Sequence, residues 1–163
     1  MSLDAAQRRA VLGHPAGWIA VGFGTGLSPV APGTVGSAAA ALIWLLLRQL
    51  DPLSIFFVIA VAFFIGVWAS NVVIARLRID DPGSIVWDEF VGQWITLLPL
   101  LVWPMPDVWI VLGFGLFRLL DIWKPWPIRW ADTHIKGGLG VMADDILAGA
   151  FAAGVFAAIL ALA

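Results

Sequence analysis

The sequence predicts an all-α fold, a polytopic membrane bundle of about five apolar helices. Apolar residues make up 61% of the chain and charged residues 12%, whereas soluble domains have about 45–50% and about 25%. One apolar run, residues 53–75, carries no charge over a length that crosses a bilayer. The runs lack the alternation of a β-barrel, so helices are the remaining way to satisfy the backbone in lipid.

The expected helices follow the apolar runs in order. The polar start, residues 1–17, and the glycine-interrupted residues 18–31 do not form a convincing signal peptide. The five runs are residues 35–47, 53–75, 90–103, 108–123 and 139–162. The first is short for a span of about 20 residues and can also be interpreted as re-entrant. Pro99 predicts a kink or an end in the third run, and small residues in the last run allow close packing in lipid.

We expect all 163 residues to form a single domain, and the positive charges predict its orientation. With the amino terminus in the cytoplasm, eight of the nine Lys and Arg residues lie on or near the inside, and only Arg48 lies outside. This asymmetry is typical of the positive-inside rule. The same threading places five acids at the inner ends of three runs: Asp88, Glu89, Asp121, Asp144 and Asp145. We therefore expect one polar site at the cytoplasmic face.

Composition excludes several classes of function. The formal net charge is −2, so no nucleic-acid partner is expected. The chain has no Cys, which excludes disulfides, thiolate metal sites and a cysteine-phosphatase mechanism. Several tryptophans, such as Trp87, Trp103 and Trp123, lie at the ends of apolar runs and are typical of an interfacial belt. Trp94 is better explained as a core residue. The sequence does not determine the oligomeric state.

Two acidic pairs, Asp88–Glu89 and Asp144–Asp145, are the candidate metal ligands. Hard cations such as Mg²⁺ prefer carboxylate, water and phosphate oxygens, and four carboxylates in a small space would repel one another without a cation. The alternative is a set of solvated acids favoured by helix amino termini, which explains one pair well but two pairs less well. Gly92 lies one turn after Asp88, so we expect open space beside these ligands.

Arg118, Asp121 and Lys124 recur every three residues, along one face of a helix. Arg118 could clamp a phosphate with two parallel hydrogen bonds, whereas Lys124 would act as a compact charge. The alternative is an Arg118–Asp121 pair that neutralises two half-buried charges. We favour Lys124 as the phosphate ligand, with Arg118 in a structural pair if both cannot reach. Lys136 is a further candidate for substrate binding, or serves only topology and attraction to anionic lipids.

A glycine-rich stretch, residues 24–37, precedes the first apolar helix. Glycines let backbone amides approach an anion, and a helix start favours phosphate. Thr34 or Ser37 is expected to cap that helix. The stretch lacks the ending of a P-loop, so close glycine packing is the alternative to a phosphate cradle. His134, in the polar connection 124–136, is more easily explained as a solvated histidine than as a general acid.

Four stretches of this chain resemble motifs of the phosphatidylglycerophosphatase A family. They are GTGLSP (24–29) with PGTVGS (32–37), GSIVWDEF (83–90), RLLDIWKP (118–125), and GGLG (137–140) with DDILAG (144–149). They come in the family order and cover about residues 18–150. The resemblance implies a multi-pass enzyme of the bacterial inner (cytoplasmic) membrane that hydrolyses phosphatidylglycerophosphate to phosphatidylglycerol with magnesium.

We therefore predict a Mg²⁺-dependent phosphatase acting on a phospholipid head group at the cytoplasmic face. The expected metal ligands, which with Lys124 carry catalysis, are Asp88, Glu89, Asp144 and Asp145. The expected substrate-binding residues are Thr34, Ser37, Arg118, Lys124 and Lys136. A small transporter or ion-conducting subunit is the alternative, because intramembrane carboxylates often mark ion pathways. The expected clustering of the acids at one face disfavours it. A structural subunit whose charged helix ends dock a partner is a third interpretation.

Overall fold

The computed structural model describes residues 3–80 and 82–163, and every regular element in these ranges is helical. In chain order, with η denoting a 3-10 helix, the elements are α1 (Ala5–Leu12), α2 (Pro15–Ala20), η1 (Gly22–Leu27), α3 (Pro32–Leu47), α4 (Pro52–Leu77), α5 (Trp87–Leu97), η2 (Leu98–Leu101), α6 (Val108–Trp123), α7 (Ile128–His134) and α8 (Gly137–Leu160). The predicted all-α class is confirmed.

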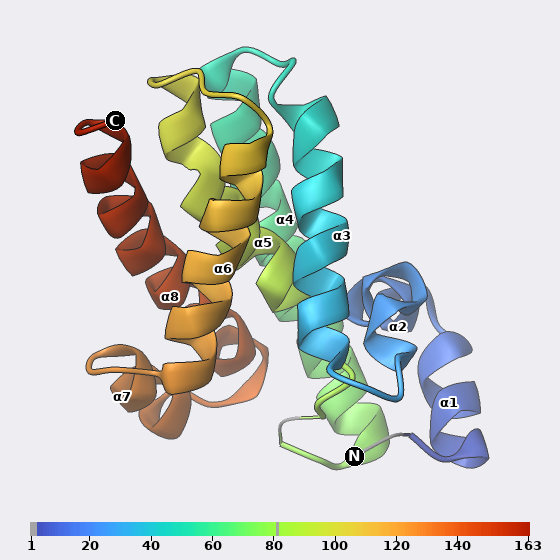
Figure 1. The fold of residues 1–163 in the computed structure, drawn as a ribbon. Helices are drawn as coiled ribbons and strands as arrows, with labels where there is room; N and C mark the ends of the chain where they lie inside the picture. Colours follow the sequence, from blue (N-terminus) through green and yellow to red (C-terminus); the bar gives the residue numbers. More distant parts are fainter. Residues whose placement is uncertain (1–2, 81) are drawn as a thin grey trace.

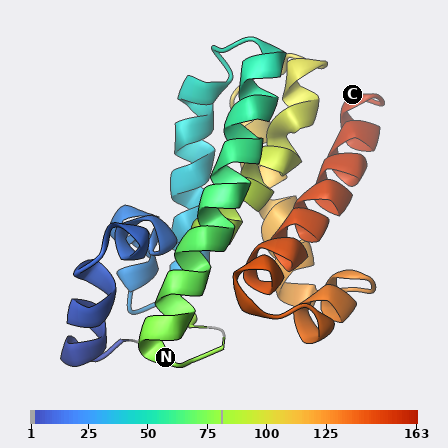
Figure 2. The same ribbon diagram turned by 180° about the vertical axis from the view of Figure 1, so that it is seen from behind.

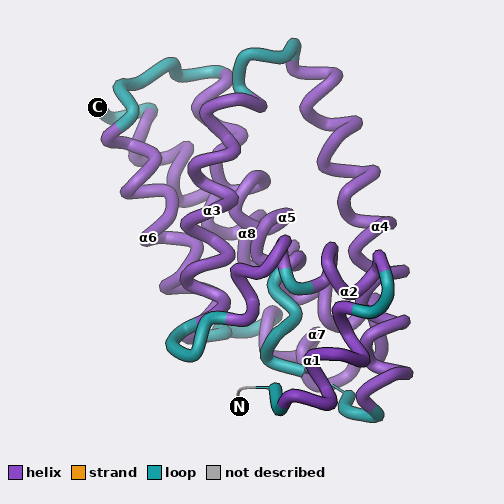
Figure 3. The backbone as a smooth tube through the Cα atoms, turned by 90° about the vertical axis from the view of Figure 1, so that its right-hand side faces the viewer, coloured by secondary structure: helices purple, strands orange, loops and turns teal. Residues whose placement is uncertain are grey.

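Helices α3, α4, α5, α6 and α8 form a bundle with roughly parallel axes (Figure 1). Seen from behind, α4 runs along the outside of the bundle over its whole length (Figure 2). The short helices α1, α2 and α7 gather at one end, and the loops that join α3 to α4 and η2 to α6 lie at the other (Figure 3). The carboxyl terminus also lies at that second end. We call the first end the α7 end.

Sequence signals set the boundaries of α4 and α6. Asp51 precedes α4 and accepts a hydrogen bond from the Ser54 amide at 3.1 Å, with Pro52 in the first turn. Helix α6 has the expected bounds, 108–123, and ends because Lys124 adopts a left-handed conformation (φ 46°) before Pro125.

The bounds of α5 and α3 differ from those of the apolar runs that predicted them. The run 90–103 is divided into α5 and the 3-10 turn η2, which contains Pro99, so the predicted kink or end is confirmed. The predicted capping of α3 by Thr34 or Ser37 is wrong. Helix α3 already begins at Pro32, so both residues lie inside it, and the Ser37 hydroxyl donates to the Gly33 carbonyl at 2.8 Å.

Two helices, α4 and α8, are long and apolar enough to cross a membrane. Their 26 and 24 residues extend about 39 and 36 Å, more than the roughly 30 Å of a hydrocarbon core. Helices α3 and α6 have 16 residues each and α5 has 11, which is short of a usual span. The sequence predicts about five apolar helices in the membrane, and two of them, α4 and α8, have the length and composition of a membrane span.

Large apolar side chains remain exposed along the outside of α4. Leu53, Phe57 and Phe64 lie on one face of this helix and are 79%, 69% and 70% exposed. Exposed apolar surface of this kind is rare on water-soluble monomers and marks a protein or lipid contact. Trp94, in contrast, is buried and donates its indole hydrogen to the Ala40 carbonyl at 3.0 Å, which confirms its core position.

Helices α5 and α8 approach each other closely at two glycines, Gly92 and Gly149. A Cβ atom built on Gly149 would lie 2.4 Å from the Gly92 carbonyl oxygen, and one built on Gly92 would lie 2.7 Å from the Asp145 carbonyl oxygen. Only hydrogen fits between the backbones at these positions. This contact places the acidic start of α5 beside the acidic pair of α8.

Candidate active site and metal centre

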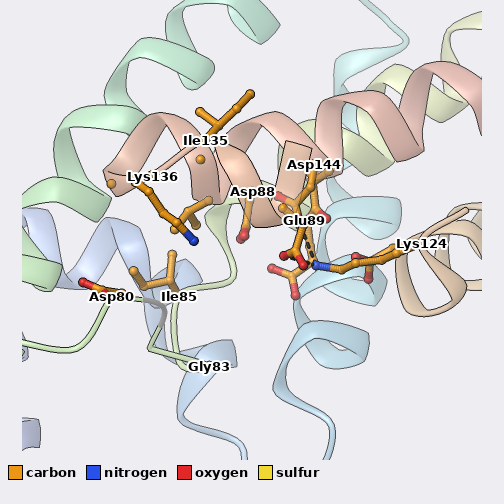
Figure 4. A pocket seen from close by; sticks show the side chains of 15 residues that line it. Asp80, Gly83, Ile85, Asp88, Glu89, Lys124, Ile135, Lys136 and Asp144 are labelled. Atoms are coloured by element: carbon orange, nitrogen blue, oxygen red, sulfur yellow. Dashed lines mark hydrogen bonds and ion pairs between the residues drawn. The ribbon is translucent and has the colours of Figure 1, made fainter. Parts of the chain in front are cut away.

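A polar cavity of about 180 Å³ opens at the α7 end, among α5, α7, α8 and the end of α6 (Figure 4). Its charged lining residues are Asp80, Asp88, Glu89, Asp121, Lys124, Asp132, Lys136, Asp144 and Asp145. The structure therefore brings together both acidic pairs and two of the predicted cations.

The two acidic pairs reach the cavity from different helices. Asp88 and Glu89 lie in the first turn of α5, whereas Asp144 and Asp145 lie about two turns into α8 and are buried. The expectation of open space beside Gly92 is wrong, because the Phe117 ring and the α8 backbone fill it. The absent side chain at Gly92 admits the neighbouring helix and not a ligand.

Three of the four predicted metal ligands converge. One carboxylate oxygen each from Asp88, Glu89 and Asp145 lies within 4.8 Å of the others. Asp144 stands next to this group, but its Oδ2 atom accepts a hydrogen bond from the Lys124 ammonium at 2.6 Å. We call Asp88, Glu89 and Asp145 the acid cluster.

The acid cluster has the chemistry of a site for a hard cation. Within the described ranges, Asp88 Oδ1, Glu89 Oε2 and Asp145 Oδ2 are buried and have no hydrogen-bond partner. Leaving a buried charged group unpaired is costly, and three carboxylates that converge also repel one another. Carboxylate oxygens are the ligands that Mg²⁺ and Ca²⁺ prefer, so these residues fit a divalent ion. Solvated acids at a helix start do not match their burial.

Lys124 lies at the wall of the cavity, just beyond the end of α6. Its Nζ atom lies 2.7 Å from Asp132 Oδ1 and 2.6 Å from Asp144 Oδ2. Partial burial disfavours the ammonium charge, but the hydrogen bonds to these two carboxylates outweigh it and raise the pKa of Lys124 above its ordinary value. The side chain is therefore a permanent cation at neutral pH.

Arg118 lies behind the acid cluster and does not line the cavity in the described part of the chain. Its Nη1 atom lies 2.5 Å from Asp121 Oδ2 and 3.9 Å from Glu89 Oε1, and it donates to Ser37 Oγ at 3.3 Å. A Cβ atom on Gly33 would lie 2.1 Å from Glu89 Oε1. This geometry matches the predicted Arg118–Asp121 pair and places Glu89 against the start of α3.

Of the other predicted residues, one lies at the rim of the cavity and the rest do not line it in the described part of the chain. Lys136 is exposed at the cavity rim, on the other side of Asp88 and Glu89 from Lys124 in Figure 4. Thr34 is half-buried in the first turn of α3, and neither it nor Ser37 belongs to the described cavity lining. His134 is exposed and its ring stacks on Trp130.

Sequence reasoning missed Asp132 and the helix that carries it. The sequence predicts only a polar connection over residues 124–136, but this segment contains α7, which brings Asp132 to Lys124. Two signals point to the helix. Pro127 is the N-cap, one residue before the first helical position at which proline is favoured, and the apolar residues Ile128 and Ala131 are three residues apart, a helical spacing that puts both on the buried face.

A family model and several known proteins are similar to this chain. The family model described as phosphatidylglycerophosphatase A matches residues 18–160. The phosphatidylglycerophosphatase A of Escherichia coli (strain K12) is 46% identical over 153 residues, which cover 93% of this chain and 87% of that protein. The enzyme of the same name from Haemophilus influenzae is 43% identical, with 85% of each chain covered.

A third relative shows that the name of the substrate varies among similar chains. A protein of Bacteroides thetaiotaomicron with the provisional name phosphatidylinositol-3-phosphatase is 41% identical over 82% of this chain and 86% of its own length. No solved structure matches. The extent of the family match and the level of identity establish that this chain belongs to the phosphatidylglycerophosphatase A family of phosphoric monoester hydrolases.

Proposed function

We propose that this protein hydrolyses phosphatidylglycerophosphate to phosphatidylglycerol and phosphate, with Mg²⁺, at the cytoplasmic face of the bacterial inner membrane. The observation that carries the proposal is the acid cluster, whose three carboxylates converge and each keep one buried oxygen without a described hydrogen-bond partner, at the cavity that Lys124 also lines. Hydrolysis of a phosphate monoester mainly requires stabilisation of charge on the phosphoryl group. A cation site and a fixed ammonium group at one cavity provide it.

Asp88, Glu89 and Asp145 would hold the metal, and Asp144 stands beside them as the acceptor for Lys124. When bound, Mg²⁺ would neutralise phosphoryl oxygens and lower the pKa of a water molecule. The carboxylates of the acid cluster fix the position of this charge, and the helices that carry them hold one another through the Gly92–Gly149 contact.

Lys124 and Lys136 would bind the phosphate. An ammonium group has three hydrogen-bond donors, and Asp132 and Asp144 use two of those of Lys124. The third is available to a phosphoryl oxygen. Lys136 at the rim adds a second positive charge that attracts an anionic head group. Arg118 and Ser37 support Glu89 from behind, and Thr34 belongs to the same first turns of α3.

The whole chain would form one membrane domain, with α3, α5 and α6 lying in the bilayer beside α4 and α8. The exposed apolar face of α4 supports a lipid surrounding. With the α7 end in the cytoplasm, Arg48, at the carboxyl end of α3, would be the outside cation, paired there with Asp107. The lipid tails would stay in the bilayer while the head group reaches the cavity. Clustering of the acids at one end of the bundle disfavours an ion-conducting pathway.

Phosphate release by the purified protein tests the proposal. A panel of phosphatidylglycerophosphate, phosphatidate and phosphatidylinositol 3-phosphate would be presented in mixed micelles, with and without Mg²⁺. We expect Mg²⁺-dependent release that is fastest from phosphatidylglycerophosphate. Preference for the phosphoinositide, or equal release in chelator, would contradict the proposed substrate or the proposed metal, respectively.

A further inference from the structure

A second concave surface adjoins the cavity on the far side of Lys124. It is a groove of about 520 Å³ on the surface of the α7 end, and its lining residues are Trp123, Lys124, Pro125, Trp126, Arg129, Trp130 and Thr133. This volume falls in the range of small-ligand pockets, about 300–1,000 Å³. Because Lys124 lines both the groove and the cavity, a molecule that binds across this residue reaches both.

Three tryptophans make the groove apolar yet leave it uncovered. Trp123, Trp126 and Trp130 are 71%, 82% and 50% exposed. Tryptophans with an apolar ring and a polar N–H are enriched at the level of lipid head groups. They come from the end of α6, the turn after it and α7, so two consecutive elements concentrate this aromatic surface at one position.

Arg129 adds a positive charge to the same groove. It is exposed, and within residues 3–80 and 82–163 it forms no ion pair. The neighbouring acid on α7, Asp132, is bound to Lys124 and lines the cavity, and it is not among the residues that line the groove. A guanidinium group without a carboxylate partner is well suited to bind a phosphate.

We propose that this groove binds the phosphodiester and the adjoining acylglycerol part of the lipid substrate, while its phosphomonoester occupies the cavity. This rests on the proposed function. A phosphatidylglycerophosphate head group carries two phosphates separated by one glycerol. The cavity offers Lys136 and the groove offers Arg129, and Lys124 lines both surfaces. Arg129 contacts the diester, and the tryptophans contact the glycerol and the first methylenes of the chains. The arrangement selects lipids that carry a second phosphate between the monoester and the chains.

Two variants separate the roles of the groove. Trp126→Ala removes aromatic surface, and Arg129→Gln removes the charge; neither residue touches the acid cluster or Lys124 through any described hydrogen bond or ion pair. The assay would measure KM and kcat for dioleoyl phosphatidylglycerophosphate in mixed micelles of nonionic detergent. The deacylated head group, glycerophosphoglycerophosphate, would be added as a competitor to obtain its inhibition constant. Trp103→Ala and Arg9→Gln, which lie outside the groove, are the matched controls.

We expect Arg129→Gln to raise both KM for the lipid and the inhibition constant of the head group by about tenfold, because a charge-assisted hydrogen bond is lost. Trp126→Ala should raise KM for the lipid by about tenfold and leave the inhibition constant unchanged, since the competitor has no chains. The values of kcat should stay within about twofold, because the groove binds ground state and transition state alike.

Other outcomes would overturn the inference. If both variants behave like the controls, the groove is not a substrate subsite, while wild-type turnover still supports the proposed function. Equal losses of kcat in both variants would indicate a structural role. A head group that fails to compete for the wild-type enzyme would contradict the Arg129 assignment. A wild-type protein that releases no phosphate from the lipid would overturn the proposed function and the groove together.

Discussion

The Nζ atom of Lys124 lies 2.6 Å from Oδ2 of Asp144, so the residue that ends α6 is joined to the acidic pair of α8. The same nitrogen lies 2.7 Å from Oδ1 of Asp132 on α7. One ammonium group thus connects three segments of the chain at the wall of the cavity. Lys124 consequently has a structural role in addition to the proposed phosphate contact, and a test must separate the two.

We predict that Lys124→Gln lowers turnover of phosphatidylglycerophosphate by about 10²-fold or more, because charge stabilisation of the transition state is lost. Lys124→Arg should restore part of the rate, since it keeps the charge but replaces a compact ammonium with a planar fork. Turnover in mixed micelles at saturating Mg²⁺ measures this, alongside thermal unfolding. If Lys124→Gln unfolds earlier but keeps most of its rate, Lys124 is only a structural link.

Replacing one carboxylate of the acid cluster by an amide should have opposite effects on turnover and on the stability of the protein without metal. Asp88→Asn and Asp145→Asn should abolish turnover, because each removes a proposed metal ligand. Without metal, each should match or exceed the thermal stability of the wild type, because one of three repelling carboxylates is gone. Mg²⁺ should stabilise the wild type, by about 2.7 kcal/mol at a concentration 100 times its dissociation constant, and should not stabilise the variants.

Asp107→Asn is the matched control for this experiment. Asp107 is an acid at the opposite end of the bundle, where it pairs with Arg48. Its variant should retain both turnover and stabilisation by Mg²⁺. Normal turnover in Asp88→Asn and Asp145→Asn would contradict the proposed metal site, and stabilisation by Mg²⁺ that persists in both would place the ion elsewhere.

The sequence was sufficient to predict the helices of the bundle, though not the short helices at the α7 end, and to predict that the acids meet at one end of the bundle. Apolar runs bounded by Asp51–Pro52 and by Lys124–Pro125 contain their own start and stop signals, so α6 has the expected bounds and α4 begins one residue early. Alternating the runs then brings residues 88–89 and 144–145 to one end, as Figure 1 and Figure 4 show for the helices that carry them.

The sequence was not sufficient to predict which neighbour fills a space or takes a hydrogen bond. A glycine at position 92 leaves space that either a ligand or a neighbouring helix can fill. In the folded protein the Phe117 ring and the α8 backbone fill it. In the same way, nothing local indicates that Asp144 turns to Lys124 while Asp145 turns to Asp88 and Glu89. Adjacent helix residues point about 100° apart, so Asp144 and Asp145 meet different neighbours, and the partner of Asp144 depends on where Lys124 lies at the end of α6.

The proposed orientation predicts that the two ends of the chain lie on opposite sides of the membrane. The chain has no native Cys, so single cysteines introduced at Ala5 and Ala161 report location without background. In intact cells, a membrane-impermeant maleimide should label the residue at 161 and not the one at 5. Permeabilised cells should show labelling of both. Labelling of both positions in intact cells, or of neither, would contradict an odd number of crossings.

The contact between Gly92 and Gly149 predicts a loss of stability that a neighbouring glycine does not share. An alanine Cβ at position 149 would lie 2.4 Å from the Gly92 carbonyl oxygen, so α5 and α8 must separate, and overpacking of this kind costs about 1–3 kcal/mol. Gly154 lies on the same helix, and a Cβ atom added there would have no neighbouring atom within 4 Å. Gly154→Ala should therefore leave stability unchanged or raise it by up to about 1 kcal/mol through helix propensity.

Separation of the helices also moves Asp145 from Asp88, so Gly149→Ala should lose turnover and Mg²⁺ stabilisation, while Gly154→Ala keeps both. Thermal unfolding in detergent and phosphate release measure these effects, and a Gly149→Ala protein that matches wild type in both would show that this contact does not position the acid cluster.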